Sequence, residues 1–156
     1  MKNYKILIFI IIVLPLIIFL VDITNRKSKT KESEKMTENQ KIVLTINNQK
    51  LTATLTNNSS TEALVNKLKK ENITIEMEDY ANMEKVGDLG FHLPRNDQNI
   101  KTNYGDLILY QGTNFVIYYD KNSWSLTKLG KIDNISQEEL KNILGTGNVT
   151  ITLSLK

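Results

Sequence analysis

After the first forty residues, hydrophobic and polar positions alternate with a period of two, as in a β-strand that buries one face. Ile42, Leu44 and Ile46 share one face of such a strand, and the alternation resumes at Leu51 after Asn47-Asn48. Asparagine tolerates the positive φ angles of a tight turn, so this stretch predicts a β-hairpin. Similar runs predict further strands at residues 73–77, 106–110, 114–119, 124–132 and 149–155.

Two short helices are predicted between these strands. Ser59 precedes Glu62 by three residues, and Ser136 precedes Glu139 by three, which is the spacing of a capping box at a helix start. Gly145 follows the second segment and predicts its end, because glycine readily adopts the conformation found just beyond a helix.

Seven or eight short strands and two short helices in residues 40–156 indicate a mostly β fold. They fit a small closed or nearly closed antiparallel β-barrel whose helices cover its open ends. Strict alternation of strand and helix is missing, which disfavours a doubly wound nucleotide-binding sheet. Loop signals gather in residues 79–103, so we expect a long functional loop from Tyr80 to Tyr104, with part of it near Val86 to Leu93 as a strand. Gly130 is expected to be a bulge or a point of close approach.

The N-terminal residues predict a membrane anchor. Residues 6–21 are apolar apart from Pro15, they follow Lys2 and Lys5, and residues 4–23 reach the length that spans a bilayer. No site of small residues for signal cleavage follows, and the chain has no cysteine for lipid attachment. The predicted organisation is a signal anchor at 1–23, a flexible polar linker at 24–39 and a barrel domain at 40–156.

The side of the membrane on which the domain lies is indicated by weaker sequence signals. We expect the single-pass chain to hold its domain outside the cytoplasm, since a large domain can translocate despite flanking charge. The basic residues between 26 and 35 favour the opposite orientation by the positive-inside rule. A domain secreted after cleavage is the remaining alternative.

Charge and composition exclude several classes of function. Seven basic and four acidic side chains lie in residues 1–40, so the net charge of +3 belongs to that segment and the remainder is balanced. No basic footprint for nucleic acid is therefore predicted on the domain. One histidine and no cysteine exclude the common zinc sites, and we expect no metal and no cofactor.

The order of several segments resembles the bacterial cyclophilin-like domain family, whose fold is related to that of the peptidyl-prolyl isomerases. The resemblance covers residues 41–155 and rests on the opening hairpin and helix and on the segments at 84–87, 92–94, 104–110, 115–119, 129–132 and 144–151. It implies the same small barrel. The active enzymes of the related fold have a Phe-His-Arg stretch whose arginine polarises the substrate amide. Here the matching stretch is Phe91-His92-Leu93, and leucine cannot donate a hydrogen bond.

The sequence therefore predicts a membrane-tethered, non-catalytic module that binds a peptide, a protein or a small ligand. The candidate ligand-binding residues are Glu84, Lys85, His92, Arg95, Tyr119 and Trp124. Charged residues in a loop are candidates because they are free of core packing, although Glu84 and Lys85 could equally form an ion pair that anchors the loop. The strands at 106–110 and 114–119 form a central hairpin around Gln111-Gly112-Thr113. Aromatic residues around this hairpin offer contact area, and about half of them must belong to the core. The alternative is a degenerate prolyl isomerase that uses Arg95 or His92.

Overall fold

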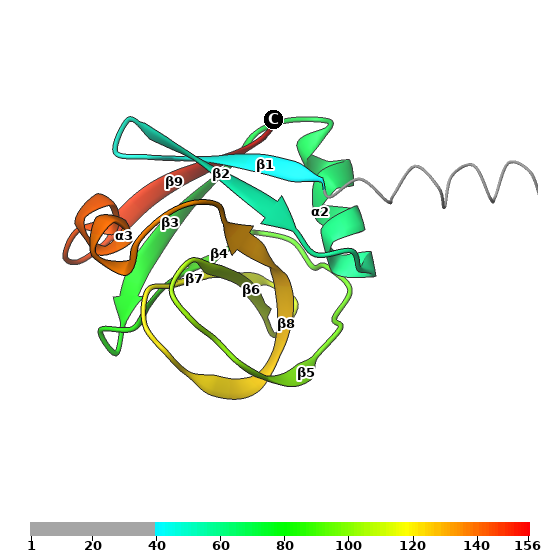
Figure 1. Ribbon diagram of the computed structural model, residues 1–156. Coiled ribbons are helices and arrows are strands. Elements are labelled where there is room, and N and C mark those ends of the chain that lie inside the picture. Colours follow the sequence, from blue (N-terminus) through cyan, green and yellow to red (C-terminus); the bar gives the residue numbers. More distant parts are fainter. Residues whose placement is uncertain (1–39) are drawn as a thin grey trace, which may run out of the picture. The chain divides into compact units, whose positions relative to one another are not determined.

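The structure of the protein is a computed structural model that describes residues 40–156 (Figure 1). Within these residues there are nine strands and two helices. The strands are β1 (Lys41–Ile46), β2 (Gln49–Leu55), β3 (Ile73–Tyr80), β4 (Glu84–Asp88), β5 (Gln98–Lys101), β6 (Asp106–Tyr110), β7 (Asn114–Tyr118), β8 (Ser123–Ile132) and β9 (Val149–Leu155). The helices are α2 (Ser59–Leu68) and α3 (Gln137–Leu144).

Eight of the strands form a closed antiparallel barrel, which confirms the predicted fold class. Their order around the barrel is β2-β1-β9-β3-β4-β7-β6-β8, and the pairing of β2 with β8 closes it. Leu55 lies opposite Gly130 in this seam. A Cβ atom on Gly130 would lie 2.4 Å from the carbonyl oxygen of Thr54, so the two backbones can approach each other only because this residue is glycine. The expected close approach at Gly130 is confirmed.

β8 is longer than the barrel requires, and its first half extends beyond the wall. There it pairs with β5, with Trp124 opposite Ile100. β5 thus adds a strand on the side of the molecule away from β1 and β2 (Figure 1). This two-stranded extension adds surface next to the outer face of the barrel.

The two faces of the barrel wall carry different hydrophobic clusters, because successive side chains of a strand point to opposite sides. Leu107, Leu109, Phe115 and Ile117 of β6 and β7 are fully buried in the main core inside the barrel. A smaller cluster gathers on the outer face of the same strands and consists of Ile108, Val116, Tyr118 and Leu126. The wall between β4 and β8 is therefore apolar on both sides.

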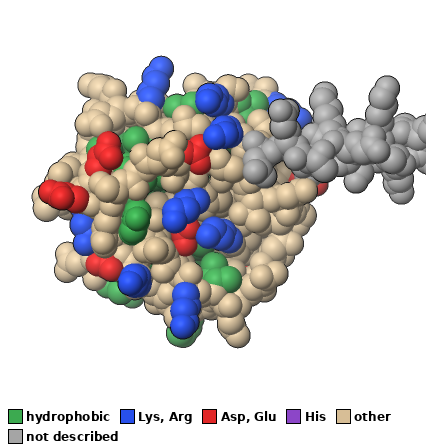
Figure 2. All heavy atoms as spheres, viewed as in Figure 1, with side chains coloured by type: hydrophobic (Ala, Val, Ile, Leu, Met, Phe, Trp, Pro, Cys, Tyr) green, Lys and Arg blue, Asp and Glu red, His purple; other side chains and the backbone are tan. Residues whose placement is uncertain are grey.

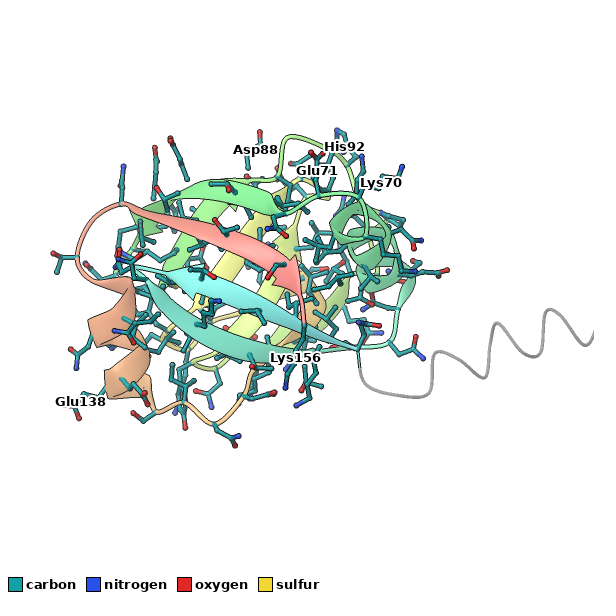
Figure 3. The ribbon with its side chains drawn as sticks, turned by 90° about the horizontal axis from the view of Figure 1, so that it is seen from above. Lys70, Glu71, Asp88, His92, Glu138 and Lys156 are labelled. Atoms are coloured by element: carbon teal, nitrogen blue, oxygen red, sulfur yellow. The ribbon has the colours of Figure 1, made fainter. Side chains whose placement is uncertain are left out.

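The helices lie at opposite ends of the barrel, as expected (Figures 1 and 3). The start of α2 differs by one residue from the prediction: its cap is Asn58 and not Ser59. The Asn58 side chain accepts a hydrogen bond from the Thr61 amide at 3.0 Å and also donates to the Lys128 carbonyl at 2.8 Å. The contact with β8 fixes Asn58 in the cap position. α3 is capped as predicted, since Ser136 accepts from the Glu139 amide.

The segment from Tyr80 to Tyr104 is not one long loop, because it contains β4 and β5. The strand expected near Val86 to Leu93 is confirmed in part, since β4 begins two residues earlier and ends at Asp88. β3 turns directly into β4 through Ala81 and Asn82, both with a φ of 52°. Alanine rarely adopts positive φ, so the sequence carries no clear turn signal here. The hairpins at Asn47-Asn48 and Gln111-Gly112, where positive φ falls on asparagine, glutamine and glycine, occur as predicted.

The predicted anchor at 1–23 and linker at 24–39 lie outside the described residues. Within residues 40–156, no helix combines the length and the apolar character needed to cross a membrane. On the face shown in Figure 2, basic and acidic side chains are interspersed. That face therefore carries no large patch of a single sign.

Candidate functional site

A groove runs over the outer face of the barrel wall, where β4, β7 and β6 lie side by side. We call it the outer groove; its volume is about 460 Å³, within the range of ordinary ligand sites. It is lined by Tyr80, Glu84, Val86, Tyr110, Asn114, Val116, Tyr118, Asn122, Trp124 and Leu126. The outer hydrophobic cluster supplies its apolar floor.

Four of the ten residues that line the outer groove are aromatic. Tyr80 and Trp124 are each 61% exposed, and they are the two large hydrophobic side chains that the described part of the chain leaves in solvent. Tyr110 is half-buried, whereas Tyr118 is buried and its hydroxyl accepts a hydrogen bond from Asn122 at 3.0 Å. Such rings combine a large apolar surface with a polar atom, which suits them to contact a ligand. Both exposed rings of the described residues thus lie in the outer groove.

Glu84 is the acidic residue of the outer groove. Burial raises the pKa of its carboxyl group, and the neighbouring Tyr118 hydroxyl offsets part of that rise. One carboxylate oxygen, Oε2, is shut off from solvent and has no hydrogen-bond partner within residues 40–156. A buried polar oxygen without a donor is rare in folded proteins, so this charge is poorly compensated.

Lys85 follows Glu84 in β4 and consequently points to the other side of the wall, into the barrel. Its side chain is fully buried. The ammonium lies 2.6 Å from the Asp79 carboxylate and donates to the Gly147 carbonyl at 2.5 Å. A buried charge is tolerated when it is paired and hydrogen-bonded in this way.

Tyr119 completes this internal ion pair. Its hydroxyl donates to the Asp79 carboxylate at 2.9 and 3.0 Å. Desolvation raises the pKa of Asp79, but the hydrogen bonds from Lys85 and Tyr119 outweigh it, so the pKa falls below its ordinary value. Burial, followed by the hydrogen bond to Asp79, raises the pKa of Tyr119, which keeps its hydroxyl protonated as a donor.

α3 covers this end of the barrel. The side chain of Gln137 donates to the Tyr119 carbonyl at 2.9 Å, and the Lys141 ammonium lies 5.6 Å from the centre of the Tyr119 ring. The Lys85 ammonium is closed off from solvent, and the Asp79 side chain is 23% exposed. The chemistry of the cluster of Asp79, Lys85 and Tyr119 suits it to holding the barrel end together.

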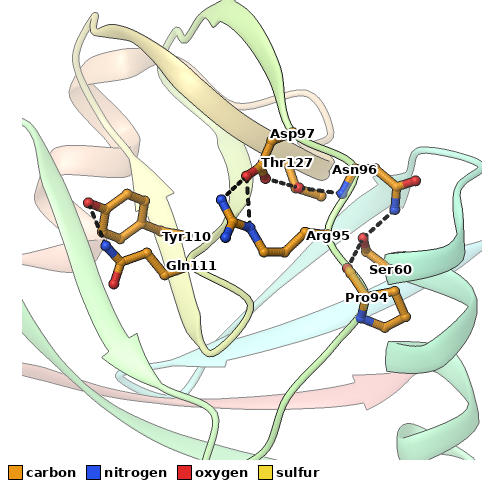
Figure 4. Close-up of polar contacts among 8 residues, drawn as sticks. All are labelled: Ser60, Pro94, Arg95, Asn96, Asp97, Tyr110, Gln111 and Thr127. Carbon is orange, nitrogen blue, oxygen red and sulfur yellow. Dashed lines mark hydrogen bonds and ion pairs between the residues drawn. The ribbon is translucent and has the colours of Figure 1, made fainter.

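Arg95 and His92 lie on the segment between β4 and β5. Arg95 donates through Nε to Asp97 at 2.8 Å, and its Nη2 contacts the same oxygen (Figure 4). A hydrogen bond from Thr127 is the main cause of the lowered pKa of Asp97, and Arg95 adds to it. The guanidinium is thus engaged within its own segment. His92 is exposed at the surface (Figure 3).

The same segment is attached to α2. Asn96 donates to the Ser60 hydroxyl at 2.7 Å, and that hydroxyl donates to the Pro94 carbonyl at 2.5 Å (Figure 4). Asn96 also donates through its backbone amide to Thr127 of β8. These contacts fix residues 94–97 between the helix and β8, just before β5.

Both the sequence and the fold of this barrel are similar to those of known proteins. The sequence profile described as the cyclophilin-like family matches residues 44–154. The chain belongs to the cyclophilin-like family. Among solved structures, the solution structure of a hypothetical protein from Archaeoglobus fulgidus aligns with a TM-score of 0.56 and 9% sequence identity. The alignment covers 76% of this chain and 95% of that chain, and at this identity it shows a common fold alone. Curated protein sequences give no match.

In this cyclophilin-like domain, the six predicted site residues fall into three separate places. Glu84 and Trp124 meet in the outer groove. Lys85 and Tyr119 meet at the barrel end, and His92 and Arg95 lie on the segment that precedes β5. The structure therefore brings together two pairs and not one set of six.

Tyr80 and Asp79 belong to these clusters but were not among the six candidates. Both belong to β3, in which Ile75 and Met77 are buried at alternate positions. Continuing that alternation by two residues places Asp79 on the inner face and Tyr80 on the outer face, so the signal was present. Within residues 40–156, no group of three or more His, Cys, Asp or Glu residues is arranged to hold a metal ion.

Proposed function

We propose that residues 40–156 form a non-catalytic binding module whose ligand occupies the outer groove. The observation that carries this proposal is the pair of exposed rings, Tyr80 and Trp124, beside the half-buried carboxylate of Glu84. Large exposed aromatic side chains that share one groove mark interaction sites, because a ligand that covers them removes apolar surface from water. The groove volume of about 460 Å³ accommodates a few residues of a peptide.

The residues that line the groove support binding without covalent chemistry. Glu84 is the one carboxylate among them, and no histidine, lysine or serine lines the groove beside it. Burial, as the largest cause, raises the pKa of Tyr118 above its ordinary value, so its hydroxyl stays protonated. A nucleophile paired with a base, the arrangement that covalent catalysis needs, is missing from this set of residues.

Selection of peptides on the full chain tests the binding module. A displayed library of random ten-residue peptides is the probe. We expect selected peptides to lose at least tenfold in affinity on Trp124→Ala and on Tyr80→Ala. The matched control is Glu138→Ala, an exposed position on α3, which leaves affinity unchanged. Selected peptides that bind all three variants as tightly as the unchanged chain would overturn the proposal.

A prolyl isomerase assay tests the absence of catalysis. We expect the full chain to leave the isomerisation rate of a proline tetrapeptide unchanged, since the guanidinium of Arg95 is held by Asp97. Turnover that disappears in Arg95→Ala would contradict this part of the proposal and favour an altered isomerase.

We further propose that residues 4–23 tether the module to the cell membrane, with the module outside the cytoplasm. Support comes from the apolar run at 6–21 and from the absence of a cleavage signal after it. Protease added to intact cells should degrade the module while a cytoplasmic marker survives. A protected module would overturn the orientation, and a module that stays in solution after the membranes are sedimented would overturn the tether.

A further inference from the structure

We propose that the outer groove recognises a basic peptide segment, whose lysine or arginine stem packs against Tyr80 and Trp124 and whose charge neutralises Glu84. This inference rests on the proposed binding function and specifies the chemistry of its ligand. It is carried by three observations: a carboxylate without a counter-charge, the rings beside it and an acidic hollow that continues the groove.

The first observation is the state of the Glu84 carboxylate. Two buried side-chain oxygens in residues 40–156 lack a hydrogen bond, Glu84 Oε2 and Asp106 Oδ1. Asp106 Oδ1 lies 2.9 Å from the Lys128 ammonium, so its charge is matched. Glu84 accepts a hydrogen bond from the Tyr118 hydroxyl but takes part in no ion pair of the described residues. A cation that enters the groove would supply the missing charge.

The second observation is the combination of this carboxylate with aromatic rings. The faces of tryptophan and tyrosine rings attract cations, and the methylene stem of lysine or arginine packs well against apolar surface. Tyr80, Tyr110, Tyr118 and Trp124 all line the same groove as Glu84. A neutral ligand would cover the rings but leave the carboxylate without a counter-charge, and an anionic ligand would be repelled.

The third observation is that acidic side chains continue beyond the groove. A neighbouring hollow of about 550 Å³ shares Val86 and Asn114 with the outer groove. Glu76, Glu78 and Asp88 line this hollow, and none of them takes part in an ion pair of residues 40–156.

Glu76 and Glu78 are exposed on the outer face of β3, where they alternate with buried residues. The acidic side chains thus extend along the barrel wall from Glu84, over a distance that more than one residue of a bound peptide would cover. This extension favours a peptide with two or more basic side chains over an isolated amine. It also disfavours nucleic acid and anionic lipid, which carry the same sign of charge as the wall.

A pair of matched peptides tests the inference. The basic probe is a capped Ala-Ala-Lys-Ala-Lys-Ala peptide, and its partner carries acetyl-lysine at both lysine positions. Binding to the full chain is measured by calorimetry at neutral pH. Trp124 is the single tryptophan of the protein and lines the groove, so a change in its emission shows that the peptide occupies this site.

We expect the basic peptide to bind at least tenfold more tightly than the acetylated peptide and to shift the emission of Trp124. Glu84→Gln should reduce that preference at least fivefold, because glutamine keeps the shape of the side chain and removes its charge. Glu138→Gln, on α3, is the matched control and should keep the preference unchanged. Circular dichroism of each variant verifies that the barrel is intact.

The possible outcomes separate this inference from the proposed function. Equal affinity for both peptides, or a preference that survives Glu84→Gln, overturns recognition of basic ligands. If these peptides fail while peptides from the random library bind through Trp124, the charge inference fails and the binding module stands. If no peptide from either experiment depends on Trp124 and Tyr80, both proposals fail.

Discussion

Glu84 and Lys85 are neighbours in the chain but lie on opposite sides of the barrel wall, Glu84 in the outer groove and Lys85 in the sealed interior. The alternation of side chains along β4 separates the two charges. The two charges therefore have different surroundings: the carboxylate lines the groove in which we propose that a ligand binds, whereas the ammonium contacts Asp79 and Gly147 at the barrel end. Substitutions on the two sides should have different effects.

Asp79→Ala should destabilise the barrel strongly. The substitution leaves the fully buried ammonium of Lys85 without its counter-charge, which costs about 3 kcal/mol of unfolding free energy. Urea unfolding of the full chain, followed by circular dichroism, measures the change. The control is Asp120→Ala, which removes the partner of Lys141 in an exposed pair and should leave the free energy of unfolding nearly unchanged. Equal losses in the two variants would contradict the structural role of the internal pair.

The contribution of Asp79 should disappear in acid. Its pKa in the folded protein lies below the unfolded value of 3.8, so the ionised group stabilises the fold at pH values above 3.8. That stabilisation is lost as the pH falls through the lower, folded pKa. Asp79→Asn should therefore be less stable than the unchanged chain at neutral pH. The difference in free energy of unfolding between the two should shrink below pH 3.8. A difference in free energy of unfolding that stays constant down to strong acid would refute the stabilising role of ionised Asp79.

Glu84→Gln should have the opposite effect on stability. Burial raises the folded pKa of Glu84 above its ordinary value of 4.5, so ionisation of this group at neutral pH opposes folding. The favourable contribution of the protonated group is present below pH 4.5 and is lost as the pH rises through the folded pKa. We expect a higher melting temperature for the glutamine variant at neutral pH and little difference below pH 4.5. A variant that melts earlier at neutral pH would count against a poorly compensated carboxylate.

Gly130→Ala should open the seam of the barrel. The added Cβ atom would lie 2.4 Å from the Thr54 carbonyl oxygen and 3.0 Å from the Leu55 Cα atom, both in the backbone of β2. Backbone atoms cannot rotate away, so we expect a loss of about 3 kcal/mol in unfolding free energy. Lys131→Ala, at the exposed next position of β8, is the control and should change it by at most about 0.5 kcal/mol. If Gly130→Ala is as stable as Lys131→Ala, the barrel tolerates a wider spacing between β2 and β8.

Ala81→Gly should stabilise the turn between β3 and β4. Ala81 has a φ of 52°, a conformation that costs an L-residue more than it costs glycine. Relief of this strain exceeds the extra entropy of glycine in the unfolded chain, and we expect a gain of about 0.5 kcal/mol. Ala63→Gly, inside α2, should instead lose about 1 kcal/mol. Urea unfolding measures the free energy of unfolding of both variants, and the two changes should have opposite signs. A lower free energy of unfolding in both variants would argue against strain at Ala81.

The sequence predicted the barrel because most of its strands follow simple alternation. Ile42, Leu44 and Ile46 are all fully buried, and the Asn47-Asn48 turn has the positive φ angles that asparagine allows. The β3–β4 hairpin escaped prediction because its turn starts at an alanine. The helix cap was displaced by one residue because a contact between Asn58 and β8, invisible in the local sequence, decides it.

The candidate site was predictable only in part. Glu84 and Trp124 were identified singly from their chemical types, but their meeting depends on how β4, β7, β6 and β8 pair. The ion pair between Asp79 and Lys85 could have been predicted if β4 had been recognised as a strand. Asp79 continues the inner face of β3, where a carboxylate needs a cation on the neighbouring strand. Asp79 and Lys85 indeed lie opposite each other in the register.

The position of β9 also governs how the barrel assembles. β9 follows all the other strands along the chain, yet it lies between β1 and β3, with Leu155 opposite Ile42. The hairpins β1–β2, β3–β4 and β6–β7 form from nearby residues, but the ring cannot be completed before β9 bridges the first and third strands. Pairing between residues so far apart in the chain is typical of small domains that refold slowly.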